Sequence, residues 1–322
     1  MSSYAELGIH RYMLRDAQRN EAYRRALKHV VKPGDTVLDV GAGTGILSVF
    51  AAAAGARRVY AVERTAIADV AREVIECNGY SECIEVMQSD LEDVTLPERV
   101  DVIVSEWMGG FGVDENILAP LVMARDRWLR PGGTMVPGRV TAMMVPAHMP
   151  DYDDAMAHWR NPALGIDLSV IAELTAHENI HTQTPPSALV AEPQRMWSHD
   201  PHTCSLEEAD QAFTTKLVFE ATAPVTMSGI LTWFVAEMGD GTTLSNAVGG
   251  PDTHWGRSMF PLDRAIDLVA GSKVTVELVC APSMPGTCEF SWTVQVDDRT
   301  PEVHETRRAR RDAVRKHARA RS

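Results

Sequence analysis

The sequence of 322 residues lacks the features of a secreted, disulfide-bonded or membrane-spanning protein. Its five cysteines are odd in number and show no Cys-x-x-Cys spacing, which supports neither a disulfide framework nor a zinc site. The longest apolar run, residues 45–56, is too short to cross a bilayer, and the N-terminus has neither the basic nor the apolar region of a signal peptide. We therefore expect a cytoplasmic protein without bound metal, whose thiols are reduced and mostly buried.

The 44 acidic residues outnumber the 31 basic residues, Lys and Arg, and the formal net charge is −13. This balance argues against generic nucleic-acid binding and favours cationic substrates. Residues 301–322 depart from it as a basic tail that either stays solvated or contacts nucleic acid, an acidic partner or the protein's own acidic face. The basic residues of the tail are Arg307, Arg308, Arg310, Arg311, Arg315, Lys316, Arg319 and Arg321.

The spacing of apolar residues divides the rest of the chain into three parts. Residues 1–33 have helical spacing, interrupted at Gly8. Residues 34–146 alternate short β-rich runs with helical stretches, and this alternation predicts a doubly wound parallel sheet. The last helical stretch, 118–129, is ended by Arg130-Pro131-Gly132-Gly133, and residues 134–145 return to strand. Residues 147–300 are rich in strands after a polar, helix-compatible stretch at 151–186, which predicts a second, β-rich domain.

A glycine loop, Asp39-Val40-Gly41-Ala42-Gly43-Thr44-Gly45, joins a predicted strand to a predicted helix. Glycines there let the backbone approach a ligand, and the helix N-terminus offers free N–H groups. Glu63 ends the next strand about 20 residues on, where an acid suits a ribose diol. Glu92, with Asp90 beside it, follows a third strand and is placed to accept from an adenine amino group. These elements fit an adenosyl ligand, whereas NAD-type dehydrogenases prefer a Gly-x-Gly-x-x-Gly spacing that is missing here.

Two carboxylates, Glu106 and Glu115, lie in a glycine-rich segment directly after the apolar strand 100–104. A guanidinium group has a rigid fork of N–H donors that two carboxylates can grip in plane. Two solvated loop acids are the alternative, because acidic side chains are mostly exposed. The glycine loop upstream and the Thr-His-Trp segment at 253–255 downstream favour the clamp.

Over nearly its whole length the chain resembles the protein arginine methyltransferases. The matching segments are residues 4–10, 13–16, 37–48, 105–115 and 253–255. The resemblance implies a transferase that uses S-adenosyl-L-methionine and releases S-adenosyl-L-homocysteine. It further implies a Rossmann-like cofactor-binding domain followed by a β-barrel domain, with a helical dimerisation arm at about 151–186, and hence a homodimer.

The resemblance also assigns roles around the cofactor. It places Arg19 at the cofactor carboxylate, His10 and the glycine loop around the methionine part, Glu63 at the ribose and Glu92 at the adenine. The complete predicted cofactor set is His10, Arg19, Asp39, Gly41, Gly43, Thr44, Gly45, Glu63, Asp90, Glu92 and Glu106.

On the substrate side, Glu106 and Glu115 are expected to hold the guanidinium and draw its positive charge toward the nitrogens they contact. Asp16 and His254 resemble the family's carboxylate–imidazole pair, which orients the site and carries the released proton away. The predicted substrate-binding residues are Tyr4, Met13, Trp255, which would wall the guanidinium, and Asp114. Members that make symmetric dimethylarginine have phenylalanine where this chain has Met13, so monomethyl or asymmetric dimethyl products are expected.

Gly110 and Asp114 stand where family members usually have aromatic residues, which predicts a roomier and more acidic substrate mouth. Two substrates therefore stay open: an arginine residue of a protein or peptide, and free L-arginine. Asp114 would pair with the α-amino group of the free amino acid or equally with a flanking basic residue of a peptide. The alternative from another class is a catalytically silent cofactor-binding scaffold that recruits a partner through its basic tail. The intact Glu106, Glu115 and His254 argue against that alternative.

Overall fold

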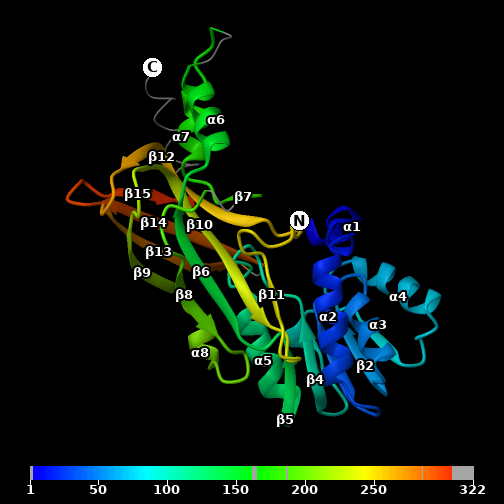
Figure 1. Ribbon diagram of the computed structural model, residues 1–322. Coiled ribbons are helices and arrows are strands. Elements are labelled where there is room, and N and C mark those ends of the chain that lie inside the picture. Colours follow the sequence, from blue (N-terminus) through cyan, green and yellow to red (C-terminus); the bar gives the residue numbers. More distant parts are fainter. Residues whose placement is uncertain (1–2, 162–164, 186–187, 285, 307–322) are drawn as a thin grey trace.

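The computed structural model describes residues 3–161, 165–185, 188–284 and 286–306 (Figure 1), so the basic residues from 307 onward lie outside the described part. After a short turn, η1 (Ser3–Ala5), come α1 (Leu7–Leu14) and α2 (Ala17–Val30). The expected interruption at Gly8 is wrong, because α1 runs through it. The break falls at Asp16 instead, whose carboxylate accepts from the N–H of Arg19 at 2.9 Å and so caps α2.

A five-stranded parallel sheet follows, in the strand order β3-β2-β1-β4-β5. β1 is buried along its whole length, as expected of a central strand covered on both faces. The helix expected to end before residues 130–133 does so, at Trp128, but the strand expected to begin at Thr134 begins earlier, because residues 130–133 already belong to β5, which pairs with β4. The elements are β1 (Thr36–Val40), α3 (Ile46–Ala53), β2 (Arg58–Val62), α4 (Ile67–Cys77), β3 (Ile84–Met87), η2 (Leu91–Asp93), β4 (Val100–Ser105), α5 (Leu118–Trp128) and β5 (Leu129–Val136).

Two antiparallel sheets form the second half, in the orders β7-β12-β10-β6-β8, with β11 paired to β10, and β15-β14-β13-β9. Figure 1 shows this half beside the parallel sheet, with the N-terminal helices near the junction. The elements are β6 (Val140–Ala147), β7 (Ile180–Thr182), β8 (Gln194–His199), α8 (Leu206–Ala209), β9 (Phe213–Glu220), β10 (Val225–Glu237), β11 (Thr243–Ser245), β12 (Arg257–Leu268), β13 (Lys273–Met284), β14 (Thr287–Val296) and β15 (Glu302–Glu305).

The predicted fold class, a Rossmann-like domain followed by a β domain, is confirmed, but two of the predicted boundaries are not. The boundary at 146 falls inside β6, which pairs only with antiparallel strands, so the change of architecture lies between Val136 and Val140. The tail boundary at 301 comes too early, because β15 pairs with β14 and belongs to the second half.

The predicted arm contains two helices, α6 (Pro150–Arg160) and α7 (Ser169–Thr175), which project from the antiparallel half (Figure 1). Met156, Ala172 and Ala176 form a small core of their own there. The expected range 151–186 is too long, since β7 lies within it and pairs with β12. Among the described residues, no helix is both long and apolar enough to cross a membrane.

Candidate active site

A cavity of about 670 Å³ lies at the carboxyl ends of the parallel strands, a size usual for small-ligand sites. The glycine loop forms one wall. Gly41, Gly43 and Gly45 have φ values of 71°, 55° and 79°, which side-chain-bearing residues rarely adopt. A Cβ on Gly43 would lie 3.1 Å from the imidazole of His10, so this glycine also allows a close approach across the cavity.

Glu63 connects the loop to the next strand. Its carboxylate accepts from the N–H of Gly43 at 3.0 Å and from the N–H of Thr65 at 2.8 Å. Exposed Asp90 and Glu92 line the same cavity at the end of β3. Predicted cofactor residues that follow three neighbouring strands, β1, β2 and β3, therefore line one cavity.

Two residues of the predicted cofactor set, Asp39 and Gly45, do not line this cavity. Asp39 is fully buried beneath the loop and accepts from the hydroxyl of Ser48 at 2.6 Å. Burial raises the pKa of Asp39 to about 7, against the opposing effect of the hydrogen bonds from Ser48. Gly45 precedes α3, and a Cβ there would touch Ala71 and Ile75. Both residues thus support the glycine loop through contacts with α3 and α4 and do not face the cavity.

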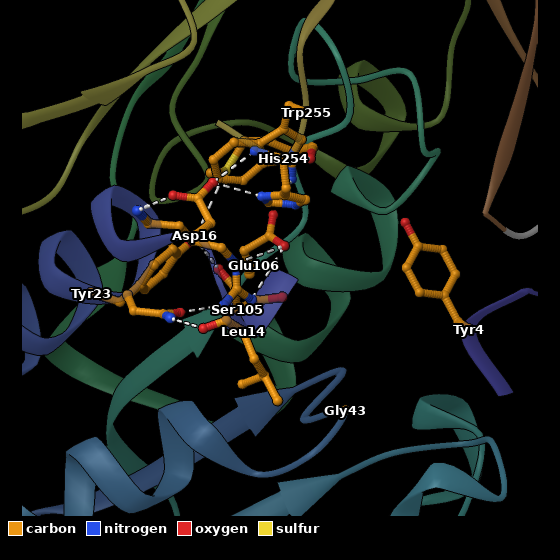
Figure 2. Close-up of polar contacts among 12 residues, drawn as sticks. Tyr4, Leu14, Asp16, Tyr23, Gly43, Ser105, Glu106, His254 and Trp255 are labelled. Carbon is orange, nitrogen blue, oxygen red and sulfur yellow. Dashed lines mark hydrogen bonds and ion pairs between the residues drawn. The ribbon is translucent and has the colours of Figure 1, made fainter. Parts of the chain in front are cut away.

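Glu106 and Glu115 line this cavity and also a second one, of about 430 Å³, that faces the antiparallel half. Tyr23 of α2 donates to the carbonyl of Ser105 at 3.0 Å and so anchors the peptide just before Glu106 (Figure 2). The hydroxyl of Tyr4 donates to Glu115 Oε1 at 2.5 Å. The two predicted clamp acids therefore stand where the two cavities meet.

The charges around this junction are coupled. Burial, reinforced by the negative charge of Glu106, raises the pKa of Glu115 well above the usual range. Arg19, only 5% exposed, lies with Nε and Nη2 each 3.4 Å from Glu106 Oε2. Arg19 is the cation that faces Glu106, and the site is thus prepared for a second cation beside Glu115.

Asp16 and His254 are paired across the junction of the two halves, 238 residues apart in sequence. Asp16 Oδ2 lies 2.9 Å from both the backbone N and Nδ1 of His254 (Figure 2). Burial favours the neutral form of Asp16, but the hydrogen bonds from His254 and Arg19 outweigh it and lower its pKa. A carboxylate only accepts, so Nδ1 of His254 carries the proton in this contact.

Trp255 lies against His254 with ring centroids 4.0 Å apart, and its indole N–H donates to the carbonyl of Met108 at 2.6 Å. From the antiparallel half, the amide of Asn246 donates to the carbonyl of Gly110 at 2.8 Å. Two side chains of the antiparallel half thus fasten the loop that links Glu106 to Glu115.

Asp114 closes a turn within this loop. Its carboxylate accepts from the N–H groups of Gly110 at 2.8 Å and of Phe111 at 3.1 Å. One acceptor position on each oxygen thus closes the turn, while Asp114 also lines the second cavity, and its pairing with a substrate amine stays a prediction. The roomier mouth expected at Gly110 is wrong: a Cβ there would collide with the hydroxyl of Ser258 and lie 3.1 Å from the ring of His181.

Known proteins and protein families were compared with this chain, and the matches are methyltransferases. Residues 140–296 match the family model described as the arginine methyltransferase oligomerization subdomain, and residues 24–136 match that of ribosomal protein L11 methyltransferase. Protein arginine N-methyltransferase 6 of Xenopus laevis is 34% identical over 292 residues, covering 87% of this chain and 85% of that protein. The chain belongs to the protein arginine methyltransferase family.

Other relatives belong to the same family. Protein arginine N-methyltransferase 1 of Saccharomyces cerevisiae is 34% identical over 88% of this chain and 83% of its own. Probable protein arginine N-methyltransferase 6 of Arabidopsis thaliana is 40% identical, but the match covers 73% of this chain and 55% of that protein. Among solved structures, the Trypanosoma brucei PRMT1 enzyme–prozyme heterotetrameric complex with AdoHcy has a TM-score of 0.85 at 30% identity, covering 95% of this chain and 100% of that one.

Several residues of this arginine methyltransferase site were not predicted from sequence. Asn179 and His181 of the β7 region and Cys288 and Phe290 of β14 line the second cavity. They come from strands without any motif, and only the pairing of β7 with β12 and of β14 with β13 brings them to the mouth. Strand register is set by tertiary packing, so no local signal marked them.

Proposed function

We propose that this chain transfers a methyl group from S-adenosyl-L-methionine to a guanidino nitrogen of an arginine residue in a protein or peptide. The observation that carries this proposal is the position of Glu106 and Glu115 at the junction of the two cavities. One cavity fits a nucleoside ligand and the other opens toward the antiparallel half. A substrate side chain in the second cavity thus meets the cofactor between two carboxylates.

The residues present fit the cofactor. Positive φ angles bring the backbone of the glycine loop to the cavity wall, and α3 begins beside it, where a helix leaves its first N–H groups without intrahelical partners. Glu63 is placed for the ribose hydroxyls, Glu92 for the adenine and Arg19 for the carboxylate. When bound, S-adenosyl-L-methionine supplies an electrophilic methyl group on a sulfonium.

Within the second cavity, Glu106 and Glu115 hold the substrate guanidinium. A guanidinium stays protonated up to a pKa of about 12.5 to 13.8, so its nitrogens are poor nucleophiles. The carboxylates draw the positive charge toward the nitrogens they contact and offset the repulsion between the two cations. Tyr4 fixes the orientation of Glu115 through its short hydrogen bond, and the remaining task is positioning.

Asp16 and His254 take up the proton that the substrate releases. Ionised Asp16 holds the Nδ1–H of His254, which leaves Nε2 to accept the proton that the guanidino nitrogen loses. Trp255, packed against His254 and tied to Met108, forms the wall of the site.

A protein-bound arginine is favoured over free L-arginine by the comparisons with known proteins. The named relatives are protein arginine N-methyltransferases. We also propose that the chain forms a homodimer through α6 and α7, because the matched family model describes an oligomerization subdomain and the arm carries its own apolar core.

The test is to incubate purified protein with isotopically labelled cofactor and either an Arg-Gly-rich peptide or free arginine, and to identify products by mass spectrometry. Methylated peptide is expected, as monomethyl or asymmetric dimethyl arginine given Met13. Turnover of free arginine alone would overturn the choice of substrate. No transfer to either would favour the silent scaffold.

A further inference from the structure

The basic tail begins beside the substrate cavity. β15 runs antiparallel to β14 with Glu305 opposite Ser291, so the chain approaches the end of β14 that lines the cavity (Figure 1). Thr306, the last described residue, accepts from the N–H of Phe290 at 3.0 Å, and its hydroxyl donates to the carbonyl of Phe290 at 3.3 Å. Phe290 is itself part of the cavity wall.

A second contact fixes the same exit point. The N–H of Glu305 donates to Nδ1 of His177 at 3.2 Å, and Asn179, two residues further along, also lines the cavity. The described chain therefore ends, at Thr306, between two parts of the cavity wall.

Residues 307–322 are long enough to reach into this cavity, and their positive charge is opposite to that of the rest of the chain. Cys288 lies two residues before Phe290, about 7 Å along the strand, and its thiol is 3.5 Å from the carbonyl of Val113 in the loop that carries Glu115. The 16 residues from 307 to 322 span up to about 50 Å when extended. They hold eight of the 31 basic residues and one of the 44 acidic ones, so the rest of the chain has a net charge of −20.

We propose that residues 307–322 enter the substrate cavity of their own chain and that their arginines are methylated there. This inference rests on the proposed function. Each transfer forms a bond between a guanidino nitrogen of the tail and the methyl carbon, breaks the bond between that carbon and sulfur, and releases one proton and S-adenosyl-L-homocysteine. The tail is thereby a tethered substrate and a competitor of any peptide in solution.

The first experiment incubates the full chain with isotopically labelled cofactor and no peptide, followed by mass spectrometry of the tail. Label is expected on tail arginines and not on Lys316, which has similar charge but no guanidinium. Arg264 is the internal control, because its side chain is 78% exposed but lies on β12. The rate per chain should stay constant on 30-fold dilution, because a tethered reaction is first order.

The second experiment measures peptide methylation by a chain truncated after Thr306 and by a full chain in which all seven tail arginines are replaced by lysine. A short tether gives an effective concentration in the millimolar range. Truncation should therefore lower the apparent KM for the peptide several-fold with kcat nearly unchanged. The lysine variant should behave like the truncated chain, because the clamp selects the guanidinium and not charge alone.

Peptide methylation with an unlabelled tail would overturn this inference and leave the proposed function standing. Label on neither would refute the proposed function itself. A tail reaction whose rate per chain rises in proportion to protein concentration would show transfer between chains and overturn entry into the chain's own cavity. If the lysine variant keeps the wild-type KM for the peptide, the tail acts only through its positive charge, and its arginines do not compete as substrates.

Discussion

The clamp is most directly tested by Glu115→Gln. The amide has the same shape as the carboxylate, and its oxygen still accepts from the hydroxyl of Tyr4, so the loop keeps its hydrogen bond. What is lost is one negative charge at the junction of the two cavities. Because Arg19 lies beside Glu106, Glu115 is the carboxylate whose charge is left for the substrate.

The expected loss follows from this charge. Two unit charges about 4 Å apart interact by about 4 kcal/mol at an effective dielectric constant of about 20. Removing one preorganised electrostatic contact of this kind typically costs 10²- to 10³-fold in kcat, or about 2.7 to 4 kcal/mol. We therefore expect Glu115→Gln to lower kcat for a peptide by at least 10²-fold and to leave cofactor affinity within a few-fold of wild type. Glu106→Gln should lower kcat at least as much.

The pH profile gives an independent check. Burial and Glu106 raise the pKa of Glu115, so its ionised form is present above that raised pKa and is lost as the pH falls through it. The kcat/KM of the wild type should accordingly decline toward acid at a pH above the usual glutamate pKa of about 4.3.

The assay is transfer of labelled methyl to peptide, with binding of S-adenosyl-L-homocysteine measured by calorimetry. Glu277→Gln is the matched control, because this glutamate lies on β13 beside Lys216 and lines neither cavity. Turnover by Glu115→Gln within a few-fold of wild type would remove this residue from the mechanism. A parallel loss of cofactor binding would mean that the substitution damages the site as a whole.

Three further outcomes are expected. Gly43→Val should reduce cofactor affinity by 10-fold or more, whereas Gly271→Val, which also has positive φ but no neighbour within 4 Å, should leave it intact; equal calorimetric affinities would refute the close approach. Replacing residues 155–176 by a short Gly-Ser linker should give a monomer with weakened cofactor binding, while β7 stays in place; a dimer in light scattering would contradict the arm assignment. Asp114→Asn should lower kcat on peptide together with thermal stability, since an amide oxygen replaces only part of the two backbone contacts; a rise in KM alone would instead indicate direct substrate contact.

The sequence by itself determined the parallel half and its cofactor chemistry. Alternating strands and helices, the glycine spacing and Glu63 after the second strand are local patterns, and the carboxyl ends of parallel strands meet at one edge. For that reason Gly43 and Glu63 could be named from the sequence pattern alone, whereas His10 and Arg19 were named through the family resemblance; the structure gathers all four around one cavity.

Tertiary structure decided the substrate side. Asp114 looked like a free acid in the sequence but closes its own turn, and Gly110 looked like open space but faces Ser258. Neither could be predicted, because the partners come from strand register in the antiparallel half and from backbone groups without a sequence signature. The same register brings Thr306 beside Phe290, and so places the start of the basic tail at the mouth of the site.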